Sequence, residues 1–154
     1  MSKAKILIVE DNAMIRELIG IVVSQSQHYK VVGEVGDGSL VIEKCKEVQP
    51  DLVILDVLLP GMNGTEVTRK VRSEYPRVKI LGITANQRIH TIKEMLAAGV
   101  HGFVLKDDSW KELEKALDSL MAGDQYFSSS VSVLMSQALQ AQDNVDSSLT
   151  RREK

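Results

Sequence analysis

Cysteine, aromatic residues and long apolar runs are all scarce in this sequence. The 154 residues include one cysteine, one tryptophan and three prolines. Cys45 alone excludes an internal disulfide and cannot form a thiolate metal site, so we expect a reducing, cytoplasmic location. No apolar run approaches the length of a membrane span, and the first five residues lead directly into an expected strand. We therefore expect neither a signal sequence nor a membrane partner.

An excess of either charge is also missing. The 19 Lys and Arg residues are balanced by 21 Asp and Glu residues, which leaves a formal net charge of -2. The chain therefore lacks the excess of positive charge with which proteins bind nucleic acid or an anionic membrane. With 44% hydrophobic and 26% charged residues, the composition is typical of a globular domain with a full core and a short appendage.

Short β-branched runs alternate with stretches of helical spacing along most of the chain. The predicted strands cover residues 5–9, 31–35, 51–56, 78–83 and 102–105. The predicted helices follow Asn12, Gly38, Asn63, Arg88 and a capping box that begins at Ser109. Strict alternation of this kind predicts an α/β fold, with a parallel sheet covered by helices on both faces.

Polar residues stand where four of these strands end. Glu10 and Asp11 follow the first strand, Asp56 ends the third, Thr84 ends the fourth and Lys106 follows the fifth. The carboxyl ends of parallel strands lie along one edge of a sheet, so we expect these side chains to converge. Three carboxylates repel one another unless a cation joins them, and oxygen ligands suit Mg²⁺. With an ammonium and a hydroxyl beside them, the set predicts phosphoryl-transfer chemistry.

These residues, together with Pro60 and Gly64 after Asp56 and Ala85 after Thr84, resemble the receiver domain of two-component response regulators. The resemblance covers about residues 5–123. It implies a flavodoxin-like, doubly wound (βα)5 fold whose five-stranded parallel sheet has the order 2-1-3-4-5.

The resemblance also assigns roles at the site. It implies that Asp56 is the phosphoacceptor, which receives a phosphoryl group from a sensor histidine kinase. Mg²⁺ would be held by Glu10, Asp11 and Asp56, with the backbone carbonyl of Leu58 as a further ligand. The domain would promote its own phosphorylation and dephosphorylation, and is therefore expected to be a regulatory switch and not an enzyme with a separate substrate.

Three residues complete the implied switch. Lys106 would contact the phosphoryl group, Thr84 would move toward it, and Phe103 matches the aromatic position that turns inward when Thr84 moves. We expect the signal to leave through the fourth helix, fifth strand and fifth helix. Phosphorylation is expected to favour a homodimer through that surface or through the first and fifth helices.

Several details resemble the LuxR/NarL-type transcription regulators: residues 33–38, the run 98–106, and Ala122–Gly123 with Tyr126. We accordingly expect a receiver domain over residues 1–123 and an extra helix and linker over residues 124–148. Residues 149–154 resemble the start of a helix-turn-helix output domain that is absent from this chain. Transcription control and DNA binding would then belong to that missing domain.

Leu58 and Asn86 depart from the more polar choices found elsewhere in the family. Both flank the line that a hydrolytic water would take toward Asp56. An apolar Leu58 cannot orient this water, which predicts a long-lived phosphoryl group.

The sequence disfavours two enzyme classes as alternatives to a receiver domain. A haloacid-dehalogenase-like phosphatase requires a second acid two residues after its nucleophile, where this chain has Leu58. Neither G-x-G-x-x-G after the first strand nor G-x-x-x-x-G-K-[ST] is present, which disfavours a nucleotide enzyme. A third alternative is a receiver domain that no longer accepts a phosphoryl group and works as a fixed interaction domain.

His28, His90 and His101 share no ligand spacing and are expected at the surface or at helix ends.

Overall fold

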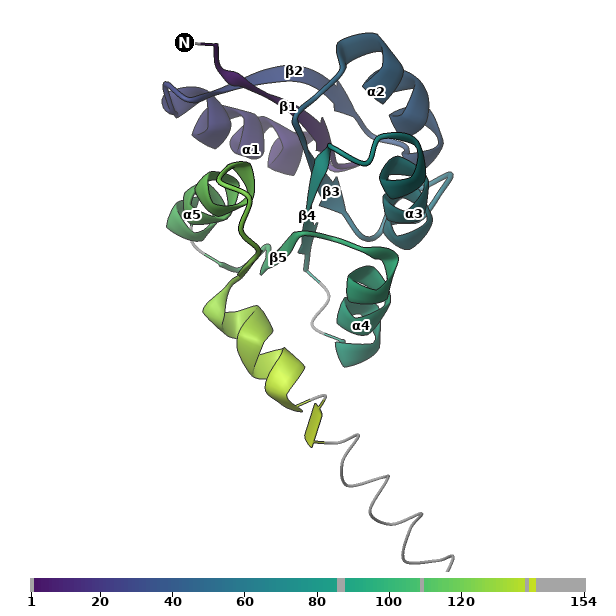
Figure 1. The fold of residues 1–154 in the computed structure, drawn as a ribbon, viewed down its shortest axis with the longest axis vertical. Coiled ribbons are helices and arrows are strands. Elements are labelled where there is room, and N and C mark those ends of the chain that lie inside the picture. Colours follow the sequence, from purple (N-terminus) through teal and green to yellow (C-terminus); the bar gives the residue numbers. More distant parts are fainter. Residues whose placement is uncertain (1, 86–87, 109, 138, 141–154) are drawn as a thin grey trace, which may run out of the picture.

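A computed structural model of the 154-residue chain describes residues 2–85, 88–108, 110–137 and 139–140 (Figure 1). Its elements are β1 (Ala4–Val9), α1 (Ala13–Gln25), β2 (Tyr29–Val35), the 3-10 helix η1 (Gly38–Leu40), α2 (Val41–Val48), β3 (Leu52–Asp56), α3 (Gly64–Glu74), β4 (Lys79–Thr84), α4 (Ile89–Ala98), β5 (Gly102–Leu105), α5 (Trp110–Met121) and β6 (Tyr126–Phe127). A further helical stretch covers residues 129–137. None of the helices in the described part of the chain has the length and apolar character needed to cross a membrane.

The sheet has six parallel strands in the order β2-β1-β3-β4-β5-β6. The predicted order of the first five strands is confirmed, but the prediction of a five-stranded sheet is wrong. The sixth strand, β6, is two residues long and pairs with Gly102 and Phe103 of β5. This pairing needs a glycine at position 102, because a Cβ there would lie 2.7 Å from the Tyr126 carbonyl oxygen.

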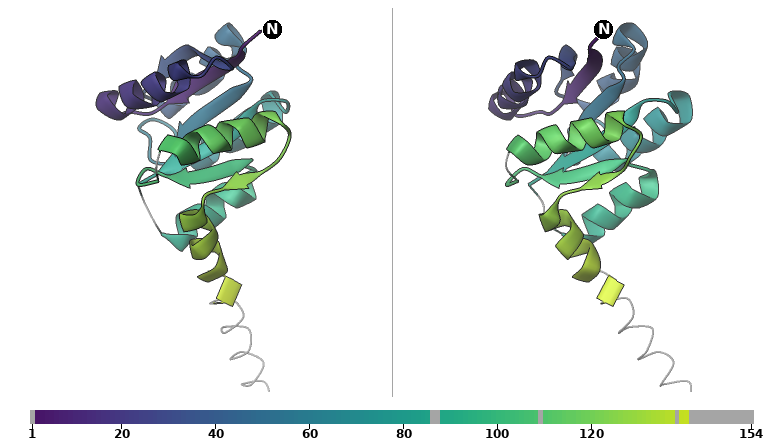
Figure 2. Two further views of the ribbon diagram at one scale, coloured as in Figure 1. Left: turned by 90° about the vertical axis from the view of Figure 1, so that its left-hand side faces the viewer. Right: turned by 60° about the vertical axis from the view of Figure 1, so that its left-hand side comes forward.

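Helices cover both faces of the sheet, as the alternation of strands and helices predicts. Helices α1 and α5 lie on one face, and α2, α3 and α4 lie on the other (Figures 1 and 2). The five residues of β3 are all buried. The core therefore consists of two apolar layers, one on each side of a fully buried central strand.

Local hydrogen bonds fix the helix ends beside the sheet edge. The Asn12 side chain accepts from the backbone N–H groups of Met14 and Ile15 and caps α1. The Asn63 side chain accepts from Glu66 N at 2.9 Å and caps α3, as predicted. Gly99 ends α4 with a φ of 106°, also as predicted. The predicted cap residue Ser109 lies outside the described residues.

The loop between β3 and α3 is held by a close backbone contact with η1. Gly38 N donates to the Pro60 carbonyl at 3.0 Å. A Cβ at position 38 would lie 1.8 Å from the Met62 carbonyl oxygen, so only glycine allows this approach. The loop that follows Asp56 is thereby fixed against the end of β2.

His101 follows the end of α4 and is partly buried, with both ring nitrogens close to other groups. Its Nδ1 atom accepts from Ile80 N at 3.0 Å, and its Nε2 atom lies 3.0 Å from an Arg72 guanidinium nitrogen. Burial, with the charges of Arg72 and Lys79, lowers the pKa of His101 to about 4. The ring is therefore neutral in the folded protein at pH 7.

We predict that this histidine weakens the fold in mild acid. The unfolded chain binds a proton at His101 near pH 6.5 and the folded chain only near pH 4, so the free energy of unfolding falls as the pH drops between these values. In His101→Gln this part of the pH dependence should vanish. Urea unfolding at several pH values measures it, with the exposed His28→Gln as control. Equal pH slopes for wild type and His101→Gln would contradict the prediction.

Candidate functional site

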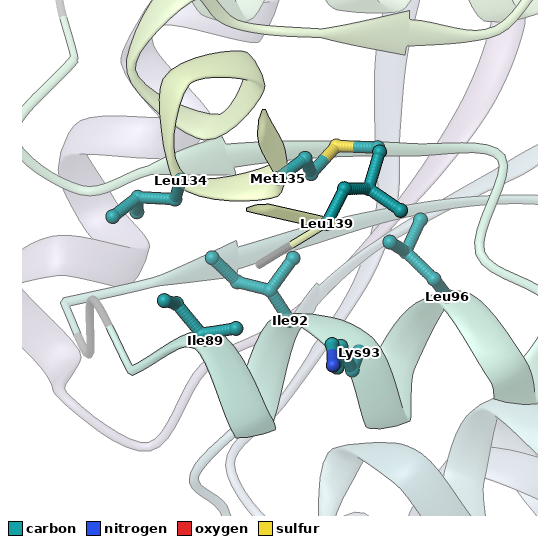
Figure 3. Close-up of a pocket in the computed structure, with 7 residues that line it drawn as sticks. All are labelled: Ile89, Ile92, Lys93, Leu96, Leu134, Met135 and Leu139. Carbon is teal, nitrogen blue, oxygen red and sulfur yellow. The ribbon is translucent and has the colours of Figure 1, made fainter. Parts of the chain in front are cut away.

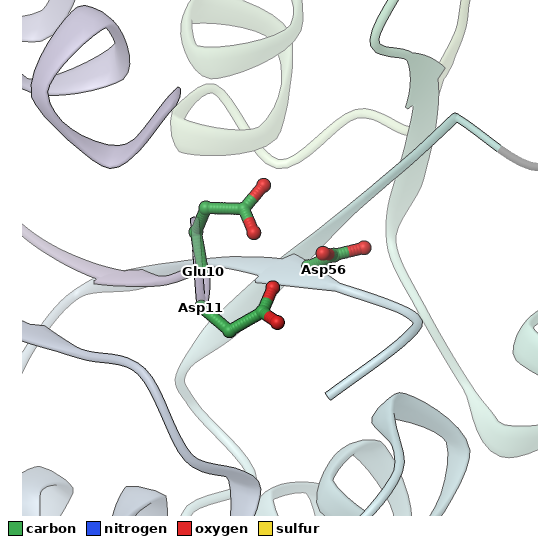
Figure 4. A group of neighbouring side chains, drawn as sticks. All are labelled: Glu10, Asp11 and Asp56. Carbon is green, nitrogen blue, oxygen red and sulfur yellow. The ribbon is translucent and has the colours of Figure 1, made fainter. Parts of the chain in front are cut away.

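Three acidic side chains meet at the carboxyl edge of the sheet, where the sequence places them. Glu10 follows β1 and Asp56 ends β3, and these strands are neighbours with Val9 opposite Leu55. Asp11 approaches from the start of the next loop (Figure 4). The carboxylates of Glu10, Asp11 and Asp56 each offer an oxygen within 4.8 Å of the others. Glu10 is fully buried and Asp56 is 3% exposed, while Asp11 is exposed.

The two buried acids have few hydrogen-bond donors. Asp56 Oδ1 accepts from Leu58 N at 3.2 Å, and Glu10 Oε2 accepts from Asn12 N at 3.1 Å. Glu10 Oε1 lies 2.5 Å from Lys106 Nζ, yet it accepts no well-aligned hydrogen bond in the described structure. A buried carboxylate is costly unless its charge is compensated, so this cluster depends on the cation beside it.

Lys106 supplies that cation. Its Nζ atom also lies 3.1 Å from Asp56 Oδ2. Its backbone N–H donates to the carbonyl of Thr84 at 2.8 Å, which fixes the start of the side chain at the end of β4. Burial disfavours the charged ammonium, but the contacts with Glu10 and Asp56 outweigh this and raise the pKa of Lys106. Lys106 therefore stays charged at neutral pH.

The cluster fits a small divalent cation. All its potential ligand atoms are oxygens, and three carboxylates face one ammonium. These are the properties that suit Mg²⁺. Leu58 donates its N–H to Asp56, and the role of its carbonyl as a ligand stays a prediction.

The predicted switch residues are both buried. Thr84 and Phe103 have no exposed surface. The Phe103 ring packs where Gly82 leaves room, since a Cβ at position 82 would lie 3.0 Å from Phe103 Cδ2. The structure thus has the aromatic ring inside, between β4 and α4, and the switching itself stays a prediction. Asn86 lies outside the described residues.

Sequence reasoning missed two residues that support the site. Arg16 of α1 donates to the Glu10 carbonyl at 2.7 Å. Asp108 accepts from Leu105 N at 2.7 Å and holds the turn that follows Lys106. The helical position of Arg16 and the acid two residues after Lys106 are visible in the sequence, but neither spacing indicates which backbone group is bound.

Comparison with known proteins identifies one family. The response regulator receiver domain family matches residues 6–118. The chain is 32% identical over 149 residues to the response regulator protein VraR of Staphylococcus aureus, and the alignment covers 97% of this chain and 71% of VraR.

Solved structures have the same fold. The isolated receiver domain of RcsB from Salmonella enterica serovar Typhimurium, studied with the phosphomimetic BeF₃⁻, superimposes with a TM-score of 0.82 at 25% identity, covering 86% of this chain and 99% of that one. A LuxR-family response regulator from Aurantimonas gives a TM-score of 0.84 at 29% identity, covering 89% and 98%.

We predict that Asp11→Asn stabilises the metal-free protein and removes its response to Mg²⁺. The variant takes away one of three repelling carboxylates, so Tm in EDTA should rise by about 2–4 °C, equivalent to about 1 kcal/mol. Binding to the folded state stabilises the wild type, by about 1.4 kcal/mol at tenfold excess of metal over Kd. Thermal unfolding with and without Mg²⁺ measures both effects.

Glu17→Gln is the matched control, because this exposed acid on α1 lies outside the cluster. It should keep the full Mg²⁺ shift. An Asp11→Asn protein with the wild-type shift would show that the metal binds elsewhere.

Proposed function

The chain belongs to the response regulator receiver domain family, and from this membership we propose that Asp56 is the residue on which its signalling depends. It is a receiver domain of a two-component response regulator, related to transcription regulators. In the proposal, Asp56 accepts a phosphoryl group from the phosphohistidine of a sensor kinase. The observation that carries it is the buried Asp56 carboxylate, set between a second buried acid and Lys106.

Each residue of the cluster has a task in this reaction. A carboxylate oxygen of Asp56 forms a bond to phosphorus as the bond from phosphorus to the histidine nitrogen breaks. Mg²⁺, held by Glu10, Asp11, Asp56 and the Leu58 carbonyl, would neutralise charge on the phosphoryl oxygens when bound. Lys106 would contact the transferred group, which is supported by the 3.1 Å between its Nζ atom and Asp56 Oδ2. The domain in this way promotes its own phosphorylation and, with water as acceptor, its dephosphorylation.

Thr84 and Phe103 would transmit the structural change caused by phosphorylation from Asp56 to the surface of the domain. Thr84 ends β4 and its carbonyl accepts from Lys106 N, so it lies beside the lysine that meets the phosphoryl group. Phe103 lies on the neighbouring strand, with Gly82 opposite it. A phosphoryl group on Asp56 would draw Thr84 toward it and change the packing around this ring.

The kinase would approach over an apolar surface next to Asp56. Met14, Leu18 and Ile21 lie along one side of α1 at helical spacing and are 73%, 43% and 49% exposed. Leu58, two residues after Asp56, is 60% exposed. Exposed apolar side chains along α1, which begins beside the acidic cluster, together with the exposed Leu58, favour a protein partner at this surface.

A phosphorylated dimer that controls transcription is the remaining part of the proposal. One related structure is described as two RcsB dimers bound to two parallel DNAs, and it matches this chain with a TM-score of 0.83 at 25% identity. DNA would be bound through an output domain, in the cytoplasm. The motif expected to open that domain, at residues 149–154, lies outside the described residues.

We predict a single phosphoryl adduct on Asp56. Incubation with acetyl phosphate and Mg²⁺, followed by intact mass measurement, should show one adduct that requires Mg²⁺ and is absent in Asp56→Asn. Asp51→Asn is a suitable control, because Asp51 lies at the opposite end of β3. No adduct on a folded, Mg²⁺-saturated wild type would favour a receiver that works without phosphate. An adduct that survives in Asp56→Asn would place the chemistry on another residue.

We also predict that Leu58→Asn shortens the life of the adduct. The exposed Leu58 side chain offers no hydrogen bond to an attacking water, whereas an amide can orient one, so loss of phosphate should become about tenfold faster. The decay of the adduct mass after removal of the phosphodonor measures this. Leu58→Ala separates better access from orientation, because it removes the side chain without adding a polar group. An unchanged lifetime in Leu58→Asn would refute the idea.

A further inference from the structure

The carboxylate of Asp108 joins the phosphorylation site to the C-terminal helix. Its Oδ2 atom accepts from the backbone N–H of Leu105 at 2.7 Å, and its Oδ1 atom accepts from the Ser130 hydroxyl at 2.7 Å. Asp108 N returns a hydrogen bond to the Leu105 carbonyl at 3.0 Å. Lys106 lies in the turn between Leu105 and Asp108, which these hydrogen bonds close. The turn that presents the lysine is thus tied, through one side chain, to a helix that begins more than twenty residues later.

The segment that carries Ser130 is built into the domain. Ser128 N donates to the Phe103 carbonyl at 3.3 Å, continuing the pairing of β6 with β5. The Ser128 side chain accepts from Val131 N at 3.4 Å and caps the helix of residues 129–137. Val131 has no exposed surface and belongs to the same apolar cluster as Phe103. Ser130 is therefore held in place independently of its bond to Asp108.

The same helix also packs toward α4. Leu134 and Met135 of this helix, with Leu139 beyond it, face α4 across an apolar cleft of about 120 Å³ (Figure 3). The α4 side of the cleft consists of Ile89, Ile92, Lys93 and Leu96. The helix thus contacts the domain along two elements, and Ser130 is the point at which it reaches the Lys106 turn.

We propose that Asp108 and Ser130 are positioning residues for Lys106, so that the C-terminal helix forms part of the support of the phosphoacceptor site. This inference rests on the proposed function, in which Lys106 meets the phosphoryl group. A lysine side chain is long and flexible, and its ammonium is placed only as well as its backbone is held. The backbone at Lys106 is held from one side by Thr84 and from the other by the Asp108–Ser130 link.

Removal of the link should slow phosphoryl transfer without weakening the metal site. In Ser130→Ala, Asp108 loses its bond to the helix and the Lys106 turn loosens. The rate of phosphorylation by acetyl phosphate should fall about three- to tenfold, less than the roughly hundredfold loss caused by a 1 Å misplacement of a reacting group. Mg²⁺ affinity should not fall, because the acidic ligands lie on β1, β3 and the loops after them, and a displaced ammonium competes less with the metal for these carboxylates. Ser130→Thr keeps the hydroxyl and should restore the rate.

Ser132→Ala is the matched control. Ser132 is an exposed serine of the same helix, and no side-chain bond from it to Asp108 is present in the described structure. It should phosphorylate at the wild-type rate. A loss in Ser132→Ala equal to that in Ser130→Ala would overturn the proposal, because the effect would then come from the helix as a whole.

A double-mutant cycle with Lys106→Met tests whether Ser130 acts through the lysine. If it does, Ser130→Ala should cause no further loss of rate in the Lys106→Met background. An equal loss in both backgrounds, or a wild-type rate in Ser130→Ala alone, would overturn the inference. Failure of the wild type itself to form an adduct would instead refute the proposed function, so the two failures are distinguishable.

Discussion

The contact of Lys106 with the buried carboxylates of Glu10 and Asp56 is the interaction on which the rest of this structure depends. Each buried charge costs several kcal/mol unless it is compensated. Two acids and one ammonium share this cost here, and the exposed Asp11 adds a further negative charge at the rim. The cluster is therefore stable enough to fold but short of positive charge. A bound magnesium ion would supply the missing positive charge.

The order of the strands explains why Thr84 lies where it does. Lys106 follows β5 and Asp56 ends β3, and these strands are separated by β4. The lysine must therefore cross the end of β4 to reach Asp56, and its backbone N–H bonds to Thr84 on the way. Thr84 therefore ends the strand between the two residues, and its carbonyl is bonded to the backbone of the lysine that contacts Asp56. The neighbourhood of Asp56, Thr84 and Lys106 thus follows from the strand order.

The parts of the molecule that could be predicted are those with a periodic pattern of apolar residues or with a capping residue next to a helix. The strands ending at Asp56 and Thr84 and the cap at Asn63 were predicted, because burial and capping are set by neighbours in the chain. The strand at Tyr126 and Phe127 was missed, since two residues have no period and pair only once Gly102 admits them. The contacts of His101 with Ile80 and Arg72 were missed for a related reason. They join segments that only the finished fold brings together.

The sixth strand also determines how motion can pass out of the domain. A segment attached by one polar bond could detach without effect on the sheet. This segment instead pairs with β5 beside Phe103, buries Val131 in the same apolar cluster, and bonds to Asp108 through Ser130. Packed interiors respond to a displaced side chain by shifting neighbouring elements together, because they contain little free space. The helix of residues 129–137 is therefore attached at three points to the strand that carries Phe103 and to the turn that carries Lys106, so a shift of either element would act directly on this helix.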